Sequence, residues 1–289
     1  MGRNLNVVAA AMHAEGFQMG QSKLTSLIIG GLLATAVAGG AWSGELEFDF
    51  DTASFSNPTI VDNDYWPLSS LPSAVYFSEA DDGCEVNEVV VSGATRSGFG
   101  PPYDDIEAIV VEDREWVDEE CTGDTGDYVL VEATEDWFAQ DDDGNVWYLG
   151  EDTTSWDDEN DCLSTGGSWE AGEDGAQAGV VILGSPAVGE SYQQEYYEGE
   201  AEDRAKVLRL DVPVSIEFGE FDGCMKTKEY TPLAPGEVEH KYYCRLSEGG
   251  FGLMLVEELK GKTRRVEYVG ATLPGGLPDE FPTTDVCAE

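Results

Sequence analysis

Apolar side chains gather in short runs along this chain, several of which alternate with polar residues, and clusters of turn residues separate the runs. Alternation of this kind is the pattern of half-buried β-strands. Runs with strand character lie at 86–91, 106–111, 128–138, 180–183, 190–197, 207–218, 221–230, 238–246, 251–259 and 264–269. Pro213 interrupts the longest run and predicts an edge strand, a bulge or a break there.

Helical patterns are scarce in comparison. No convincing amphipathic stretch of about 12 or more residues is present, and residues 201–210 are the best candidate for one short helix. The sequence therefore predicts a mainly β protein, either an antiparallel β-sandwich or a partly closed β-barrel with long acidic loops.

The clearest local element is a β-hairpin. Aromatic runs at 136–140 and 145–149 flank the turn Asp141-Asp142-Asp143-Gly144. Asp and Gly favour tight turns, and the aromatic runs on either side have strand character. A second hairpin is predicted where residues 221–230 and 238–246 flank a turn with two prolines.

The second hairpin brings two cysteines into register. If it closes symmetrically about Leu233 and Ala234, Cys224 and Cys244 fall nearly opposite each other. Cβ atoms on neighbouring strands lie about 4.5–5.5 Å apart, close to the separation that a disulfide needs. We therefore predict a Cys224–Cys244 bond.

The first forty residues differ from the rest. Lys23 precedes an uncharged apolar run over 24–38, which at about 15 residues is short for a bilayer span. Its length and the ending Ala36-Val37-Ala38 predict a cleavable signal peptide over 1–38, with Met19 as an alternative start. An uncleaved membrane anchor is the competing interpretation.

The remaining chain divides by composition. We expect an acidic linker over 39–63, a β-rich domain over 64–272 and a proline-containing tail over 273–289. No later segment is apolar for long enough to span a membrane, so we expect an extracellular or periplasmic protein.

Charge narrows the possible partners. The formal net charge is −44, and residues 39–203 hold 43 acidic side chains against only Arg96 and Arg114. Such a field repels phosphate backbones, so nucleic acid is excluded as a partner and anionic membranes are disfavoured. Either salt adaptation of the surface or binding of hard cations such as Ca²⁺ explains the acidity.

Composition also indicates that the chain folds, and the number of cysteines favours disulfides. Seven Trp, 12 Tyr and 11 Phe are too many for a disordered acidic tail, so acidic patches should lie over a packed core. Six cysteines in an exported chain favour disulfides. Apart from the pair predicted above, the sequence does not decide how Cys84, Cys121, Cys162 and Cys287 pair.

Histidine chemistry has little support. Only His13 and His240 are present, and His13 would leave with the signal peptide. No nucleophile motif accompanies His240, so Ser-His or Cys-His catalysis is disfavoured. A hydrolase that uses two carboxylates, for example on glycans, stays open as the enzymatic alternative, with Glu151 and Glu170 as the acids that have aromatic neighbours.

Two binding sites are predicted around the aromatic hairpin. The first is a Ca²⁺ site, in which carboxylate and amide oxygens would converge from Asp141, Asp143, Asn145 and Glu151. A plain Asp-Gly turn is the competing interpretation. Aromatic faces with acidic rims could hold sugars or cationic groups, with ordinary core packing as the competing interpretation; the platform is Trp137, Trp147, Tyr148 and Trp169.

Several segments resemble a family of secreted bacterial proteins or lipoproteins of unassigned function. They are Thr134–Glu151, with the core Asp-Trp-Phe-Ala-Gln-Asp-Asp-Asp-Gly-Asn-Val-Trp-Tyr-Leu-Gly-Glu, then Ser168-Trp169-Glu170-Ala171-Gly172, Tyr192–Tyr196 and Glu239–Tyr243. The resemblance covers about residues 62–270. It implies a shared fold and export, and it implies no particular activity.

These observations together lead to one functional expectation. We expect an acidic exported β-domain with a non-enzymatic ligand-binding or structural role at the cell surface, whose partner is a polysaccharide or another surface component. Calcium is the candidate cofactor, as a stabiliser of the acidic loops.

Overall fold

The computed structural model describes residues 45–70, 73–80, 83–245, 252–259, 263–273 and 275–287. The signal peptide predicted over 1–38 lies outside these residues. Short 3-10 helices occur at Phe50–Thr52, Leu68–Ser70 and Thr125–Asp127. The strands are β1 (Ser73–Ala80), β2 (Gly83–Ser97), β3 (Glu107–Asp118), β4 (Val129–Gln140), β5 (Val146–Asp157), β6 (Cys162–Ser164), β7 (Trp169–Glu170), β8 (Gln177–Ile182), β9 (Ser191–Gln193), β10 (Glu195–Tyr196), β11 (Arg204–Ile216), β12 (Gly219–Tyr230), β13 (Val238–Tyr243), β14 (Leu253–Glu258) and β15 (Arg264–Gly270).

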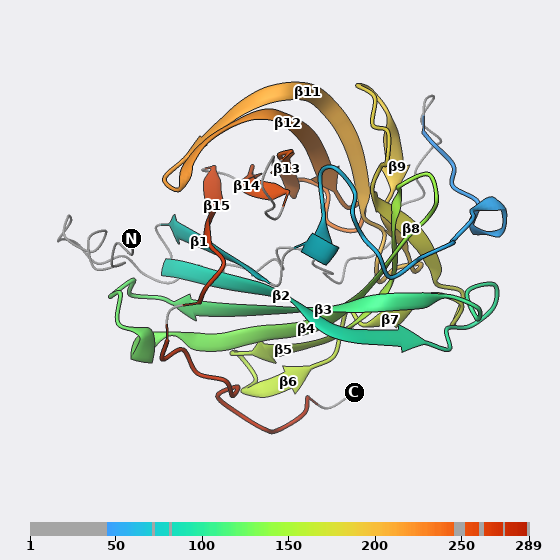
Figure 1. Ribbon diagram of the computed structural model, residues 1–289. Helices are drawn as coiled ribbons and strands as arrows, with labels where there is room; N and C mark the ends of the chain where they lie inside the picture. Colours follow the sequence, from blue (N-terminus) through green and yellow to red (C-terminus); the bar gives the residue numbers. More distant parts are fainter. Residues whose placement is uncertain are drawn as a thin grey trace.

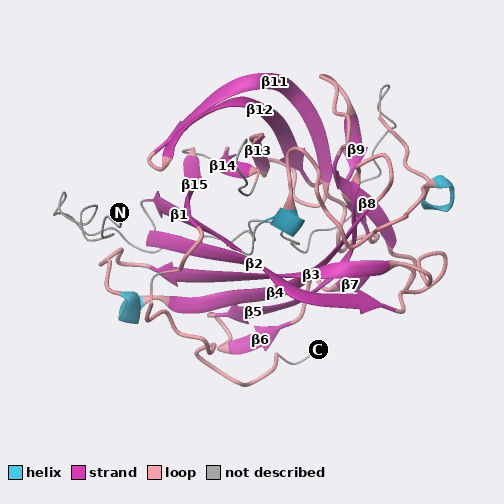
Figure 2. Ribbon diagram, viewed as in Figure 1, coloured by secondary structure: helices cyan, strands magenta, loops and turns pink. Residues whose placement is uncertain are grey.

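All these strands belong to one antiparallel sheet. Its order is β10-β8-β5-β4-β3-β2-β1-β15-β14-β13-β12-β11-β9, and β6 and β7 pair with β5 outside that path. The sheet curls until its two ends meet, with β11 and β12 arching over one side and β2 to β5 forming the other (Figure 1, Figure 2). The result is a nearly closed barrel with one unsealed seam, which confirms the mainly β prediction and selects the barrel.

The seam lies between β8 and β11, where one short segment bridges the gap. Residues 191–193 pair with β11 and residues 195–196 pair with β8, so the chain changes partner at Gln194. Between these pairings, side chains replace the backbone ladder: the Tyr192 hydroxyl and Gln194 Nε2 donate to the Val181 carbonyl oxygen at 3.3 and 3.4 Å. A barrel closed this way has its weakest strand contact at β10.

Apolar side chains pack on both faces of the sheet. The inner face and the barrel ends hold the larger core, which includes Phe138, Tyr148 and Tyr192. A second cluster on the outer face, around Trp116, lies under the C-terminal segment (red in Figure 1), and the Trp116 indole donates to the Pro278 carbonyl oxygen at 2.7 Å. The predicted tail is therefore part of the folded body.

Three disulfides join all six cysteines. The predicted Cys224–Cys244 bond is confirmed, because Met225 pairs with Tyr243 and the two cysteines lie directly opposite on β12 and β13. The other bonds, which the sequence left undecided, are Cys84–Cys121 and Cys162–Cys287. The second of these ties the C-terminal segment to β6.

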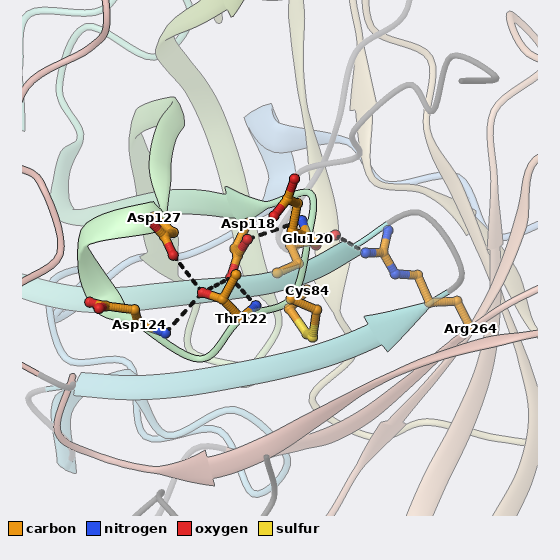
Figure 3. The surroundings of a disulfide bond; sticks show 9 residues. Cys84, Asp118, Glu120, Thr122, Asp124, Asp127 and Arg264 are labelled. Carbon is orange, nitrogen blue, oxygen red and sulfur yellow. Dashed lines mark hydrogen bonds and ion pairs between the residues drawn. A yellow bond between two sulfur atoms is a disulfide. The ribbon is translucent and has the colours of Figure 1, made fainter. Parts of the chain in front are cut away.

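The Cys84–Cys121 bond fastens the connection after β3 to β2 (Figure 3). Asp118 organises this turn, because its carboxylate accepts hydrogen bonds from the backbone N–H groups of Glu120 at 3.1 Å and Thr122 at 2.6 Å. The Asp118 carboxylate is buried, and its hydrogen bonds to the turn account for its place there.

Two predictions about local structure need correction. Residues 201–210 do not form a helix, because Ala205 and Val207 are buried at alternate positions of β11 while their neighbours are polar. The predicted linker is not a free spacer where it is described, because Phe48, Phe50 and Phe55 pack against the core. By contrast, the bulge expected at Pro213 is present as a shift in register between Val212 and Val214.

Within the described residues, no helix has the length and apolar character needed to span a membrane.

Candidate functional site: an aromatic pocket beside an acidic barrel interior

A pocket of about 310 Å³ lies where the N-terminal segment crosses the barrel wall. Phe48, Asp49, Phe50 and Asp51 form one side, and Trp147 of β5 contributes to the other. The segment is held in place at its beginning, because the Leu46 N–H donates to the Ser191 carbonyl oxygen at 2.7 Å. Backbone pairing thus positions the two phenylalanines over the barrel.

Four aromatic rings meet at this pocket. Phe50 packs edge-to-face on Tyr103 and on Trp147, with ring centroids 4.4 and 5.2 Å apart, and Phe48 contacts Trp147 at 5.9 Å. Trp147 and Tyr103 are buried, whereas the two phenylalanines are half-buried. The rings therefore form a fixed wall on the barrel side and a partly exposed one on the segment side.

The charge of the pocket comes from acids alone. Asp49 and Asp51 are exposed at its rim, and none of the described residues that line it is basic. A cation beside aromatic faces is attracted by the ring quadrupoles, and nearby carboxylates add to that attraction. The pocket therefore suits a small positively charged group.

A second set of acids is buried, most of them in the barrel interior and two, Asp118 and Asp141, in turns. Among the described residues, nine carboxyl side chains are buried and Lys241 is the one buried base. The acids are Glu85, Asp113, Glu115, Asp118, Asp136, Asp141, Glu151, Glu195 and Glu229. Buried charges are normally paired, so this excess of acid requires an explanation.

Part of the set is paired around Lys241. Its ammonium lies 3.1 Å from Glu229 Oε2 and 3.6 Å from Glu239 Oε2. Glu229 also accepts hydrogen bonds from the hydroxyls of Thr227 at 2.7 Å and Tyr243 at 3.0 Å. This side of the interior, on β12 and β13, is a satisfied ion-pair network.

The opposite side, on β4 and β5, holds what we call the acid cluster: Asp136, Glu151 and Glu195. Tyr148 Oη lies 2.6 Å from Asp136 Oδ1 and 3.0 Å from Glu151 Oε2. The Trp169 indole donates to Glu195 Oε2 at 3.1 Å. Burial raises the pKa of Asp136 to about 7 and raises the pKa values of Glu151 and Glu195 well above the usual range.

Neighbouring strands extend this acidic region. Asp113 and Glu115 on β3 are buried, and burial raises both pKa values, with nearby carboxylates adding to the effect. Asn87 Nδ2 donates to Glu115 Oε2 at 3.1 Å, whereas Glu115 Oε1 and Asp113 Oδ2 have no hydrogen-bond partner in the described part of the chain. In the described part of the barrel interior, no three carboxylates converge closely enough to hold one metal ion.

Of the four residues predicted as calcium ligands, Asp141 and Asn145 meet in the hairpin turn, where Asn145 Nδ2 donates to Asp141 Oδ2 at 2.9 Å, and Glu151 lies elsewhere. Asp141 closes the hairpin turn: its carboxylate accepts hydrogen bonds from the N–H groups of Asp143 and Asn145 at 3.0 and 2.8 Å and from the Trp147 indole at 2.9 Å. Glu151 belongs to the acid cluster inside the barrel. The turn therefore has the hydrogen bonds of a plain Asp-rich hairpin.

The four residues predicted as an aromatic platform are all buried and are distributed over three places. Trp147 lines the pocket. Tyr148 and Trp169 pack edge-to-face beside the acid cluster, with ring centroids 5.2 Å apart. Trp137 lies under the Arg96 guanidinium, whose central carbon is 4.0 Å from the ring centroid. Of the four, only Trp147 is among the described residues that line this pocket.

The pocket residues of the N-terminal segment were not predicted, because the acidic composition of residues 39–63 indicates a linker. A signal was present, since Leu46, Phe48 and Phe50 alternate strictly with acids and repeat the strand pattern on a short scale. Tyr103, in the connection between β2 and β3, had no comparable signal.

Comparison with protein families, with curated proteins and with solved structures found no match to this chain.

Proposed function

We propose that this protein is an exported, non-enzymatic binding protein that holds a small organic cation in the aromatic pocket. The carrying observation is the pocket itself, in which four aromatic rings and two exposed carboxylates meet without a basic side chain. Its volume is at the lower end of the range for ligand sites, about 300–1,000 Å³, so a compact ligand fits it best. The residues that would bind are Phe48 and Phe50 through their half-exposed rings and Asp49 and Asp51 through charge, with the buried Trp147 supporting the two phenylalanines from behind.

Export is supported by the three disulfides, because such bonds persist in oxidising compartments. The strongly acidic chain adds a long-range field that concentrates cations near its surface. Binding is favoured over carboxylate-pair hydrolysis because the acid pair joined by Tyr148 is buried, with 1 % of Asp136 and 3 % of Glu151 exposed. A substrate reaches neither carboxyl in this structure.

The test compares two probes of the same shape and different charge. Isothermal titration calorimetry with choline and with its uncharged carbon analogue, 3,3-dimethyl-1-butanol, should detect binding of choline alone. Asp51→Asn and Asp49→Asn should each weaken choline binding about fivefold, because one charge pair near a protein surface contributes on the order of 1 kcal/mol. Asp158→Asn removes one exposed charge that does not line the pocket and serves as the matched control.

Equal binding of the charged and the uncharged probe would show that the pocket recognises shape and apolar surface only. Binding of neutral sugars in place of choline would move the ligand class to carbohydrate. If none of these probes binds, the pocket is not a binding site for small ligands and a structural role at the cell surface is the remaining proposal.

A further inference from the structure

The acid cluster lies across the seam of the barrel. Asp136 and Glu151 project from β4 and β5, whereas Glu195 belongs to β10, the two-residue strand that joins the bridging segment to β8. Glu195 is the residue next to Gln194, where the chain changes partner from β11 to β8. Repulsion between these carboxyls therefore acts on the short pairing between β10 and β8.

The geometry around Tyr148 requires a proton on a carboxyl. The phenol oxygen lies within hydrogen-bond distance of both Asp136 Oδ1 and Glu151 Oε2, but it has a single hydrogen to donate. The phenol can serve one carboxylate, so the other carboxyl makes its contact only if it carries a hydrogen itself. Asp136 Oδ2 is buried and has no hydrogen-bond partner among the residues that the structure describes, which also fits an uncharged carboxyl better than a carboxylate.

The groups that face the cluster offer no neutralising base. Glu132 and Asp113 face it from β4 and β3, and Asp203 faces Glu195 from the loop before β11. Among the described residues, no Lys, Arg or His forms an ion pair with the three acids. The charge of Lys241 acts on Asp113 and Asp203, but its ammonium contacts Glu229 and Glu239.

We propose that protons held by the carboxyls of the acid cluster keep the seam closed, and that their loss as pH rises releases β10 from β8 and opens the barrel there. In the closed barrel the carboxyls are buried and take up protons, whereas in an opened seam they meet water and ionise at ordinary values. Opening therefore releases protons, so a rise in pH favours it. Burial raises the pKa of Asp136 to about 7 and those of Glu151 and Glu195 well above their usual range, so the seam weakens as pH rises from the ordinary carboxyl range, about pH 4, to neutral pH and above.

The strand that moves is set by the pairing. Asp136 and Glu151 sit on β4 and β5, which share one long ladder, and β4 has a second long ladder to β3, whereas Glu195 sits on a strand with two paired residues. Separation of β10 relieves the repulsion between Glu195 and Glu151 while most of the sheet stays paired. The side-chain hydrogen bonds from Tyr192 and Gln194 to Val181 would break in the same step.

Hydrogen exchange read by mass spectrometry tests this on the intact chain. The protection of a peptide that covers 191–197 is compared with that of a peptide from β3, both corrected for the intrinsic pH dependence of exchange. From about pH 5 to pH 7, the opening constant of the seam should rise up to about tenfold per pH unit for each proton released and then level off once the closed barrel has lost those protons, while β3 stays protected. Seam protection that falls no more than that of β3 in the wild-type protein would overturn the proposal.

Amide variants then distinguish an effect of proton loss from a general loss of stability. Glu151→Gln with Glu195→Gln removes two ionisations and keeps hydrogen-bond donors, so this variant should keep the seam protected at pH 9. Asp152→Asn, an exposed neighbour on β5, should behave as the wild type. If the double variant does not fold, infrared spectroscopy of the wild type tests the proposal instead. A buried protonated carboxyl gives a carbonyl band that is separate from the bands of carboxylates. A band that persists at pH 7 and disappears with seam protection supports the proposal, and the absence of any such band at pH 7 refutes it.

Discussion

Gly179 of β8 offers the sharpest test of how the barrel closes. A Cβ atom at this position would lie 2.4 Å from both the carbonyl carbon and the oxygen of Gln194, and 2.7 Å from Glu195 N. All three are backbone atoms of the bridging segment, so no side chain can rotate away to make room. Gly179→Ala therefore has to push the segment off β8.

The size of the effect follows from this geometry. Ordinary contacts of Cβ begin near 3.4 Å, so the bridging segment would have to move by about 1 Å. Overpacking of this kind costs about 1–3 kcal/mol. Weakened hydrogen bonds between β10 and β8 add about 0.5–1.5 kcal/mol each, which brings the expected loss to about 3 kcal/mol. A loss of that size lowers the melting temperature of a domain of this length by about 6–12 °C.

Urea denaturation followed by circular dichroism measures the loss directly. Gly219→Ala is the matched control, because the nearest atoms to its Cβ are ring carbons of Phe221 at 3.9 Å. We expect the control to change the free energy of unfolding by less than about 0.5 kcal/mol. If Gly179→Ala falls within that same margin, the bridging segment does not lie against β8 and the account of the seam is wrong.

Two further predictions concern the charges. Lys241→Met removes the base between Glu229 and Glu239, so urea denaturation near pH 8 should show a loss of about 3–5 kcal/mol, the usual cost of leaving buried acids unpaired. The loss should shrink near pH 5, since burial raises the pKa of Glu239 to about 7 and the protonated acid needs no partner. Ca²⁺ should raise the melting temperature no more than Mg²⁺ at equal ionic strength, because hydrogen bonds from the turn already occupy the carboxylate of Asp141; a specific rise of several degrees would restore the calcium site.

Much of the fold could be predicted because it depends on local pattern. Period-two alternation located most of the longer strands, although β1 was not identified. The position of Cys224 and Cys244 on either side of one turn was enough to predict their bond. The other two disulfides join residues 37 and 125 positions apart, and no local rule brings such residues together.

The side of the sheet on which the acids lie could not be predicted. Alternation separates the residues of a strand into two faces, but it does not say which face turns inward when a sheet curls into a barrel. With a net charge of −44, the expected place for carboxylates is the surface. Asp136 instead shares the inner face with Phe138, whose ring stacks on that of Tyr148, and Tyr148 in turn binds the carboxyl.

The pocket and the seam share one strand, which connects the two proposals physically. Gln177 and Ala178 of β8 line the pocket, and the same two residues pair with Tyr196 and Glu195 of β10. Release of β10 would therefore free one wall of the pocket from its neighbour, and a ligand that needs that wall in place would bind the closed barrel better. By linkage, such a ligand would also favour proton uptake by the acid cluster. A cationic probe whose affinity falls from pH 6 to pH 9 in the wild type, and does not fall when Glu151 and Glu195 are glutamine, would show that the coupling exists; equal pH dependence in both proteins would show that the pocket and the seam act independently.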